Sequence, residues 1–147
     1  MKIPAPAAVL ALALSLPVHA AGVLPAIPLT AGMHLVQAEV ANDTETRGRG
    51  LMFRESLPPN HGMLFVFEDT AEQCMWMKNT LIPLSVAFIA GDGTIVNIED
   101  MKPRTETTHC ARRPVPFALE MDRGWFAARG IKAGQKLGGL EKAPPPR

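Results

Sequence analysis

The amino-acid sequence predicts a mainly β fold: a compact antiparallel sandwich or barrel-like domain with one or two short helices. Short apolar or alternating runs recur along the chain, and turn residues separate them in place of repeated helical crossovers, which favours antiparallel pairing. Several of these runs are apolar on both faces, as strands in a sandwich or barrel are. The 147 residues, 47% hydrophobic and 20% charged, suit one domain with a hydrophobic core.

The predicted elements of the N-terminal part are short. Residues 21–32 are apolar but contain two prolines, which suits an extended lead-in or an edge strand. The segment 34–41 (HLVQAEVA) alternates between apolar and polar residues and predicts a half-buried strand. A short helix is expected over about residues 43–52, because Asn42 and Asp43 are both favoured N-cap residues.

The clearest hairpin in the sequence surrounds Gly-Asp-Gly at 91–93, which LSVAFIA and TIVNIED flank. The apolar run 62–68 (GMLFVFE) and the segment 117–121 (FALEM) predict two further strands. The segment DRGWFAARG predicts one or two helical turns, with Asp122 as the N-cap and Gly130 as the C-cap.

The chain is expected to divide into four parts. Residues 1–20 contain one lysine, an apolar run and a final Val-His-Ala, which is the layout of a cleaved secretory signal peptide. The apolar run is about ten residues long, shorter than the ~17–25 that span a bilayer, so no stable membrane span is expected after cleavage. An uncleaved anchor is the alternative. Residues 21–32 then form the lead-in, 33–140 a single β-rich domain, and 141–147 a disordered Pro-rich tail.

Charge and cysteine content indicate the compartment and exclude one class of partner. The net charge is +1, and the basic residues are scattered, so we expect no nucleic-acid partner. The signal peptide predicts a periplasmic or secreted protein, and in such an oxidising compartment the two cysteines, Cys74 and Cys110, are interpreted first as a disulfide. The alternative is a pair of free thiols that act as ligands or as a nucleophile.

The segment 74–80 (CMWMKNT) concentrates unusual side chains. If it is a strand, Trp76 and Lys78 share the face of the cysteine, and the two methionines lie on the other face. The first interpretation is packing, with the tryptophan beside a disulfide, the methionines in a core, and no cofactor. Met75 and Met77 also present two thioethers at a spacing that could serve Cu(I), so a copper site is the alternative.

A polar ligand pocket is a further interpretation of the same segment. Lys78, Asn79 and Thr80 offer hydrogen-bond donors at a strand end, where binding sites gather, and Arg47 and Arg49 could join them around an anionic or carbohydrate-like group. Alternatively, Asn79 and Thr80 satisfy the backbone of a turn, and Lys78 only extends its head to water. The candidate ligand-binding residues are Arg49, Trp76, Lys78, Asn79 and Thr80.

Three motifs that are typical of particular enzyme classes are absent from the sequence. It contains no Gly-x-Ser-x-Gly, no Walker-type loop and no GxGxxG. Acidic pairs such as Glu99 with Asp100, or Glu120 with Asp122, cannot be distinguished from surface charge by spacing alone. We therefore expect a binding or accessory module for a small polar or anionic ligand or an envelope component. An envelope glycan-acting enzyme that uses carboxylates is the alternative.

Several segments together resemble the domain of unknown function 192 family over about residues 33–140. They are RGLMFRESLP (49–58), GMLFVFE (62–68), WMKNTLIPL (76–84), FI with GDGTIVNI (88–98) and ALEMDRGWFAARGIKAGQKL (118–137). The resemblance implies a single β-rich, sandwich-like domain with short helices that is often exported in bacteria. It implies no activity, because none is established for the family.

The chain departs from the family pattern at two places. Ser85 stands where many members have Asp after the IPL segment, so a site that used this carboxylate would be missing here. Many members also carry two close cysteines in the loop before the last strand, whereas here only Cys110 lies there and the other thiol is Cys74. This departure supports a disulfide between segment 74–80 and loop 101–116, and a role of the thiols in the fold.

Overall fold

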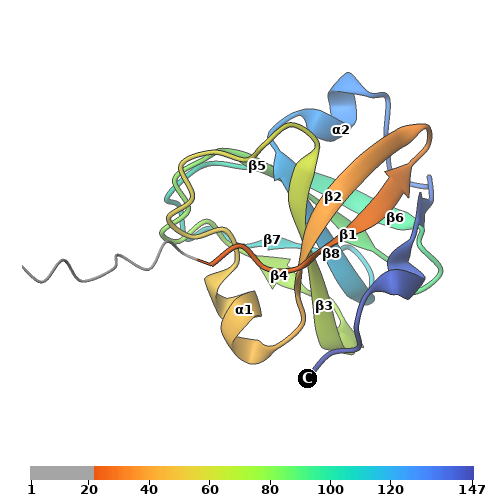
Figure 1. Cartoon of the computed structure of the whole chain (residues 1–147), viewed down its shortest axis with the longest axis horizontal. Coiled ribbons are helices and arrows are strands. Elements are labelled where there is room, and N and C mark those ends of the chain that lie inside the picture. The colour runs from red at the N-terminus through yellow and green to blue at the C-terminus, as the bar shows by residue number, and fades with distance from the viewer. Residues whose placement is uncertain (1–21) are drawn as a thin grey trace, which may run out of the picture.

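A strongly curled sheet of seven strands forms a half-barrel in the order β6-β5-β8-β3-β2-β1-β9 (Figure 1). The computed structural model describes residues 22–147, so the predicted signal peptide over 1–20 lies outside the described residues. The strands of this sheet are β1 (Ala26–Ala31), β2 (His34–Ala41), β3 (His61–Ala71), β5 (Leu84–Ile89), β6 (Ile95–Met101), β8 (Val115–Asp122) and β9 (Leu137–Gly138). The remaining elements are a ribbon of β4 (Cys74–Met75) and β7 (His109–Cys110), helices α1 (Thr44–Arg49) and α2 (Trp125–Ala128), and a 3-10 turn (Leu140–Lys142). The mainly β, barrel-like prediction is confirmed.

Strand pairing is antiparallel except between β2 and β3, which are parallel. The sequence favoured antiparallel pairing because turns, and not repeated helical crossovers, join the predicted strands, and this exception was not predicted. A parallel pair needs a crossover connection, and here α1 and the loop after it provide one. At the β9 edge of the sheet, Lys136 and Thr94 form an isolated antiparallel β-bridge, and the Leu137 N–H donates to the Gly93 carbonyl. β9 therefore lies between β1 and the start of β6.

The predicted hairpin around residues 91–93 is confirmed. β5 and β6 pair antiparallel, with Leu84 opposite Met101. Gly93 adopts a φ of 89°, a conformation that favours glycine, and the Asp92 carboxylate accepts a hydrogen bond from the Thr94 N–H at 2.9 Å. The glycine and the aspartate that predicted the turn are therefore the residues that stabilise it.

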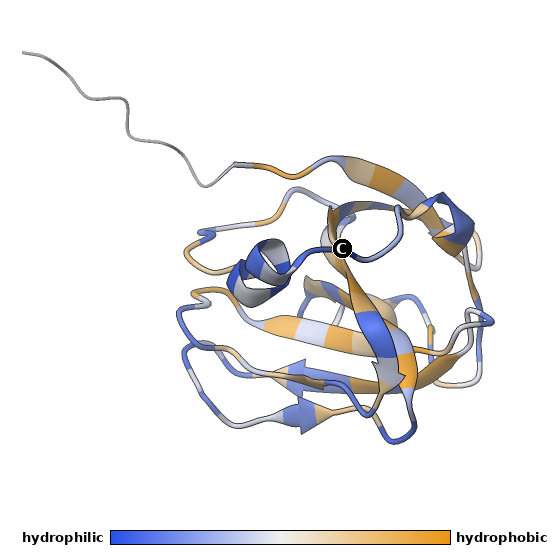
Figure 2. Ribbon diagram, turned by 90° about the horizontal axis from the view of Figure 1, so that it is seen from below, coloured by the Kyte–Doolittle hydropathy of each residue, from blue (hydrophilic) through white to orange (hydrophobic). Residues whose placement is uncertain are grey.

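The inner face of the half-barrel holds one hydrophobic core. Alternate residues of the seven strands point into it, and Trp125 and Phe126 of α2 pack against them with edge-to-face rings 5.3 Å apart. Figure 2 shows the hydrophobic residues concentrated on the strands. Among the side chains of this core are Leu29, Val36, Leu64, Ile89, Ile95, Leu119 and Leu137.

A second core lies on the outer face of β3, β8, β5 and β6. The loop that follows α1 covers this face with Leu51 and Leu57, and the segment after β4 covers it with Met77. Beneath them lie apolar side chains of the sheet, among them Met63, Phe65, Leu84, Val86, Phe88, Met101 and Ala118. The candidate site described below lies in this second layer.

Helix α1 is shorter than the predicted 43–52 helix, and its cap is Asp43. The Asp43 carboxylate accepts the Thr46 N–H at 2.8 Å, and the Thr46 hydroxyl accepts the Asp43 N–H at 3.3 Å. The helix ends at Gly50, which has a φ of 49°. No residue of α1 is buried, and Figure 2 shows the helix without a hydrophobic face. Side-chain contacts from the helix surface therefore hold it to the sheet.

Two local predictions are wrong. Asp122 is not a helix cap: it pairs with Leu84 as the last residue of β8, and α2 begins after Gly124. Segment 74–80 is not a strand, because β4 ends at Met75, and only the short β7 pairs with it. Its burial nevertheless alternates as predicted: the methionines point inward, while the tryptophan and the lysine are exposed.

The predicted disulfide between Cys74 and Cys110 is present. The two residues are direct partners in the β4–β7 ribbon, with their Cα atoms 4.0 Å apart. The bond joins segment 74–80 to the loop that contains residues 104–111. Both halves of this covalent link cover the outer core.

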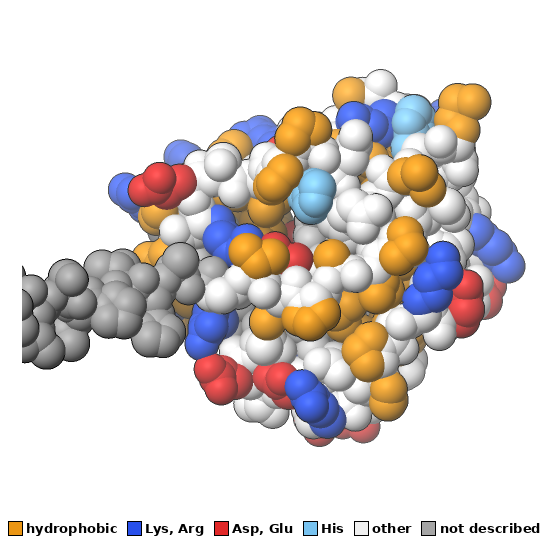
Figure 3. All heavy atoms as spheres, in the orientation of Figure 1, with side chains coloured by type: hydrophobic (Ala, Val, Ile, Leu, Met, Phe, Trp, Pro, Cys, Tyr) orange, Lys and Arg blue, Asp and Glu red, His pale blue; other side chains and the backbone are white. Residues whose placement is uncertain are grey.

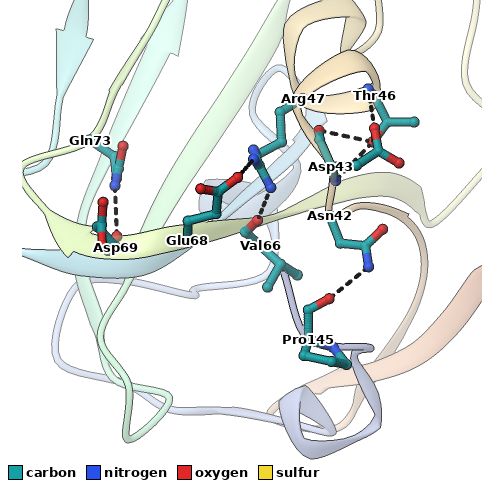
Figure 4. Close-up of polar contacts among 9 residues, drawn as sticks. All are labelled: Asn42, Asp43, Thr46, Arg47, Val66, Glu68, Asp69, Gln73 and Pro145. Carbon is teal, nitrogen blue, oxygen red and sulfur yellow. Dashed lines mark hydrogen bonds and ion pairs between the residues drawn. The ribbon is translucent and has the colours of Figure 1, made fainter. Parts of the chain in front are cut away.

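The C-terminal segment 141–147, which was expected to be disordered, packs against the end of β2. The Asn42 side-chain amide donates to the Pro145 carbonyl at 2.8 Å (Figure 4). The Arg147 N–H donates to the Asn42 carbonyl, also at 2.8 Å. The structure differs because Asn42 is buried and its polar groups need hydrogen-bond partners. The predicted lead-in 21–32 also contributes β1 to the sheet.

A buried ion pair fixes the loop after α1 to β2. The Arg54 guanidinium donates two hydrogen bonds to the Glu39 carboxylate, at 2.9 and 2.7 Å, in bidentate geometry. Both side chains are largely buried, with 16% and 7% of their surface exposed. The same carboxylate accepts the Leu24 N–H at 2.8 Å, so the pair also holds the start of the described chain.

Candidate functional site

A small pocket opens over the outer core where four segments meet. They are α1 with the residues after it, segment 74–80, and the outer faces of β3 and β8. Its volume is about 30 Å³, enough for roughly one or two water-sized groups. The lining residues are Arg47, Gly48, Arg49, Gly50, Leu51, Met52, Phe65, Met75, Trp76, Lys78, Thr80 and Glu120.

Glu120 is the unusual residue of this pocket. It lies on β8 directly between Met63 of β3 and Val86 of β5, and it is only 3% exposed. Among the described residues, no hydrogen bond reaches its carboxyl group, and no fully buried side-chain oxygen or nitrogen lacks a partner. Its carboxyl oxygens therefore contact the pocket and not solid protein.

Burial raises the pKa of Glu120 to about 8, because a carboxylate loses its hydration in this apolar layer. The carboxyl group is therefore mostly protonated at neutral pH. A protonated carboxyl is a hydrogen-bond donor as well as an acceptor. The pocket thus has a neutral O–H at its inner wall.

Three cationic side chains line the pocket, and each has an acidic partner. Arg47 donates to the Val66 carbonyl at 3.0 Å and to the Glu68 carboxylate at 2.7 Å (Figure 4). The other two ion pairs are Arg49 with Glu45 at 2.7 Å and Lys78 with Glu106 at 3.9 Å. All four side chains of these two pairs are at least 46% exposed. Exposed pairs of this kind contribute little, about 0–1 kcal/mol, so they can exchange partners easily.

Apolar side chains form the remaining walls. Phe65 belongs to the outer core, and Met75 packs against this core. Trp76 is 45% exposed at the rim, and the Lys78 ammonium lies 5.2 Å from the centroid of its ring, a cation–π distance. The pocket therefore combines a polar end with an aromatic surface beside its mouth.

Backbone hydrogen bonds hold segment 74–80 in place on both sides. The Phe53 N–H donates to the Asn79 carbonyl at 2.9 Å, which joins the segment to the loop after α1. The Met77 N–H donates to the Thr105 carbonyl, and the Arg104 N–H donates to the Thr80 carbonyl. The lining residues of this segment therefore lie on a turn that hydrogen bonds hold on both sides, which suits a preformed site.

The structure brings together four of the five predicted ligand-binding residues: Arg49, Trp76, Lys78 and Thr80. Asn79 does not line the pocket. It adopts a φ of 54°, which asparagine tolerates better than most residues, and it serves the turn. The Thr80 hydroxyl donates to the Lys78 carbonyl at 3.2 Å, so the turn also uses part of its polarity.

Sequence reasoning treated Glu120 as surface charge and missed its burial. One signal was available: in FALEM, Glu120 shares a strand face with Ala118, and apolar residues surround it along the chain. An acidic residue on an apolar strand face either reaches water or is buried at a cost. The sequence alone does not show which segments cover that face.

A second polar cavity, of about 290 Å³, is lined by Ser85, Asn97, Asp100 and Arg112 among others. Ser85 is buried, but its hydroxyl donates to Asp100 and accepts the Gly124 N–H, so this departure from the family pattern is internally satisfied. Met77, one of the two methionines considered for copper, has no exposed surface and belongs to the outer core. Within residues 22–147, no three His, Cys, Asp or Glu side chains gather as a metal site requires.

Charged side chains of both signs are mixed on the surface. On the face shown in Figure 3, basic and acidic side chains lie beside one another around groups of hydrophobic ones. No helix within the described part of the chain has the length and apolar character to cross a membrane.

Comparisons with known proteins place the chain in a family. The model of DUF192 (Uncharacterized ACR) matches residues 27–139. A crystal structure of a candidate transcription regulator from Sinorhizobium meliloti 1021 is 40% identical with a TM-score of 0.72, over 77% of this chain and 91% of that one. A protein of unknown function from Novosphingobium aromaticivorans DSM 12444 is 34% identical with a TM-score of 0.77, over 84% and 91%. No curated protein matches. The chain therefore belongs to the uncharacterised DUF192 family.

Proposed function

We propose that this protein is an exported binding module that holds a small polar ligand in the pocket over Glu120. The observation that carries the proposal is the Glu120 carboxyl group, which is buried, has no hydrogen-bond partner among the described residues and faces the pocket. Because no side chain of the described residues engages this carboxyl group and its oxygens face the pocket, its proton is available to a ligand that accepts a hydrogen bond.

The chemistry of the lining favours binding over hydrolysis. Glycosidic hydrolysis requires two carboxyl groups that flank one cleft, and among the described residues Glu120 is the one acid that lines this pocket. The expected signal peptide over residues 1–20 supports an exported location. The Cys74–Cys110 disulfide supports it too, because disulfides persist in oxidising compartments.

The test is a fragment screen followed by backbone amide NMR on the purified full-length protein. The panel contains small neutral polyols, amides, carboxylic acids and amines. We expect at least one compound to shift the amide resonances of residues 75–80 and 119–121 together. The same compound should cause no such shifts in Glu120→Ala, while Glu72→Gln, an exposed acid on the loop before β4, behaves as wild type.

Two results would count against the proposal. One is a panel in which no compound moves both sets of resonances. The other is a compound whose shifts and affinity are the same in Glu120→Ala, because the ligand would then not use the buried carboxyl group. Thermal unfolding of each variant shows beforehand that the protein compared is folded.

A further inference from the structure

Resting on the proposed function, we infer that the Glu120 pocket takes a terminal carboxylate, attached to a body that is apolar or aromatic. Glu120 donates a hydrogen bond to one carboxylate oxygen, the cations of the lining attract its charge, and Trp76 contacts the body of the ligand. The shared chemistry is the carboxylate, whether it ends a small organic acid or a peptide.

The charge of the pocket favours an anion. With Glu120 neutral, the titratable side chains that line the pocket are the cations Arg47, Arg49 and Lys78. Their acidic partners lie outside the pocket lining, and two of the three pairs are largely exposed. The charged side chains of the lining are therefore cations, which favours an anion over a neutral group or a cation.

The size of the pocket favours a small planar group. A volume of about 30 Å³ admits the two oxygen atoms of a carboxylate more readily than a tetrahedral phosphate or sulfate. Leu51, Phe65 and the strand neighbour Met63 are fixed in the outer core, so the inner wall cannot widen without disturbing packed residues. A planar group that enters edge-on fits this space.

The lining also offers aromatic and apolar surface. Trp76 is half exposed, although tryptophan is a large apolar side chain, and Met52 and Met75 line the pocket with it. Tryptophan at a rim offers contact area at low entropic cost, and methionine adapts to different apolar shapes. The ligand that uses every part of this site therefore has a carboxylate at one end and an apolar or aromatic group next to it.

The experiment compares matched probes by NMR titration of the full-length protein at about pH 6, well below the pKa of the buried acid. Benzoate carries the proposed group, benzamide is its neutral counterpart, and phenylphosphonate presents a tetrahedral anion on the same ring. N-acetylphenylalanine and its C-terminal amide represent a peptide end. We expect benzoate and N-acetylphenylalanine to bind at least about tenfold more tightly than their amides, a difference of about 1.4 kcal/mol. The tighter of the two acids identifies the source.

The pH dependence tests the role of Glu120 in particular. Above about pH 8 the buried acid ionises, and the dissociation constant for benzoate should rise about tenfold per pH unit in the wild type. The other titratable lining residues come from α1 (Arg47, Arg49) and from the turn (Lys78), and the strand neighbours Met63 and Val86 carry no titratable group. Glu120→Gln keeps an N–H donor but does not titrate, so this rise should disappear. Arg49→Gln should weaken benzoate severalfold and keep the rise.

The outcomes separate the inference from the proposed function. If phenylphosphonate binds as tightly as benzoate, or if benzamide does, the carboxylate class is wrong while the pocket still binds ligands. If the alkaline rise persists in Glu120→Gln, Glu120 is not the donor, and the inference is overturned. If no probe and no compound of the fragment panel shifts the pocket resonances of folded wild-type protein, the inference and the proposed function both fail.

Discussion

Replacing Glu120 by Gln should stabilise the protein, and increasingly so as the pH rises from about 5 to 8. The pKa of this carboxyl group is 4.5 ordinarily and about 8 in the fold, so in this interval the folded protein holds a proton that the unfolded chain has released. Its favourable contribution is complete below pH 4.5 and is lost as the pH rises toward 8. Above that value both states are ionised, and the loss stops growing.

The magnitude follows from the two pKa values. Each pH unit between them corresponds to about 1.4 kcal/mol, so the whole interval corresponds to about 3–5 kcal/mol. Because Glu120 is 3% exposed, water does not screen this effect as it does at a surface. A glutamine side chain has nearly the same shape as glutamate and does not titrate, so the Glu120→Gln variant should escape this loss.

The assay is urea unfolding followed by tryptophan fluorescence, at intervals from about pH 5 to pH 9. The difference in free energy of unfolding between Glu120→Gln and wild type should grow by about 1.4 kcal/mol per pH unit and level off near pH 8. Glu72→Gln, an exposed acid, is the control and should show no such growth. Parallel curves for wild type and Glu120→Gln across this range would refute the assignment of a buried, neutral Glu120.

Three further stability predictions use the same urea assay. Replacing Cys74 and Cys110 together by Ser should cost about 3–4 kcal/mol, because the bond closes a loop with a sequence separation of 36; an equal free energy with and without the bond would contradict this. Arg54→Met should cost about 3–5 kcal/mol, because it leaves a buried carboxylate on β2 unpaired, and a loss below about 1 kcal/mol would show that the pair is not buried in solution. Gly62→Ala should cost at least about 1–3 kcal/mol, since its Cβ would collide with the Glu120 carbonyl oxygen of β8, whereas Gly48→Ala on the open face of α1 should gain up to about 1 kcal/mol; equal effects would argue against this strand contact.

The parts of the fold that the sequence predicts are those that depend on residues close together in the chain. The hairpin at 91–93 follows from Gly-Asp-Gly between two apolar runs, and the cap of α1 follows from Asp43. The parallel pairing of β2 with β3 could not be predicted, because it depends on where a whole crossover packs. The pairing of β9 with β1 could not be predicted either, because it depends on how segments far apart in the chain pack together.

Some residues of the candidate site could be predicted from local sequence, and one could not. Trp76, Lys78 and Thr80 were found because they are polar or aromatic residues at the end of an apolar segment, a local feature. Glu120 was not found because its burial depends on the loop after α1 and on the turn after β4, which are far from it in sequence. Its strand gives only the side on which the carboxyl group points, and tertiary packing decides whether water reaches that side.

The pairing of β9 with β1 has a consequence for how the protein is made. β1 (Ala26–Ala31) pairs with β9 (Leu137–Gly138), so β1 has no β9 partner until residue 138 has been synthesised. Pairings between such distant segments raise the contact order and slow folding. Until then the edge of β1 that β9 covers stays open, and an open strand edge is a site at which chains can associate wrongly.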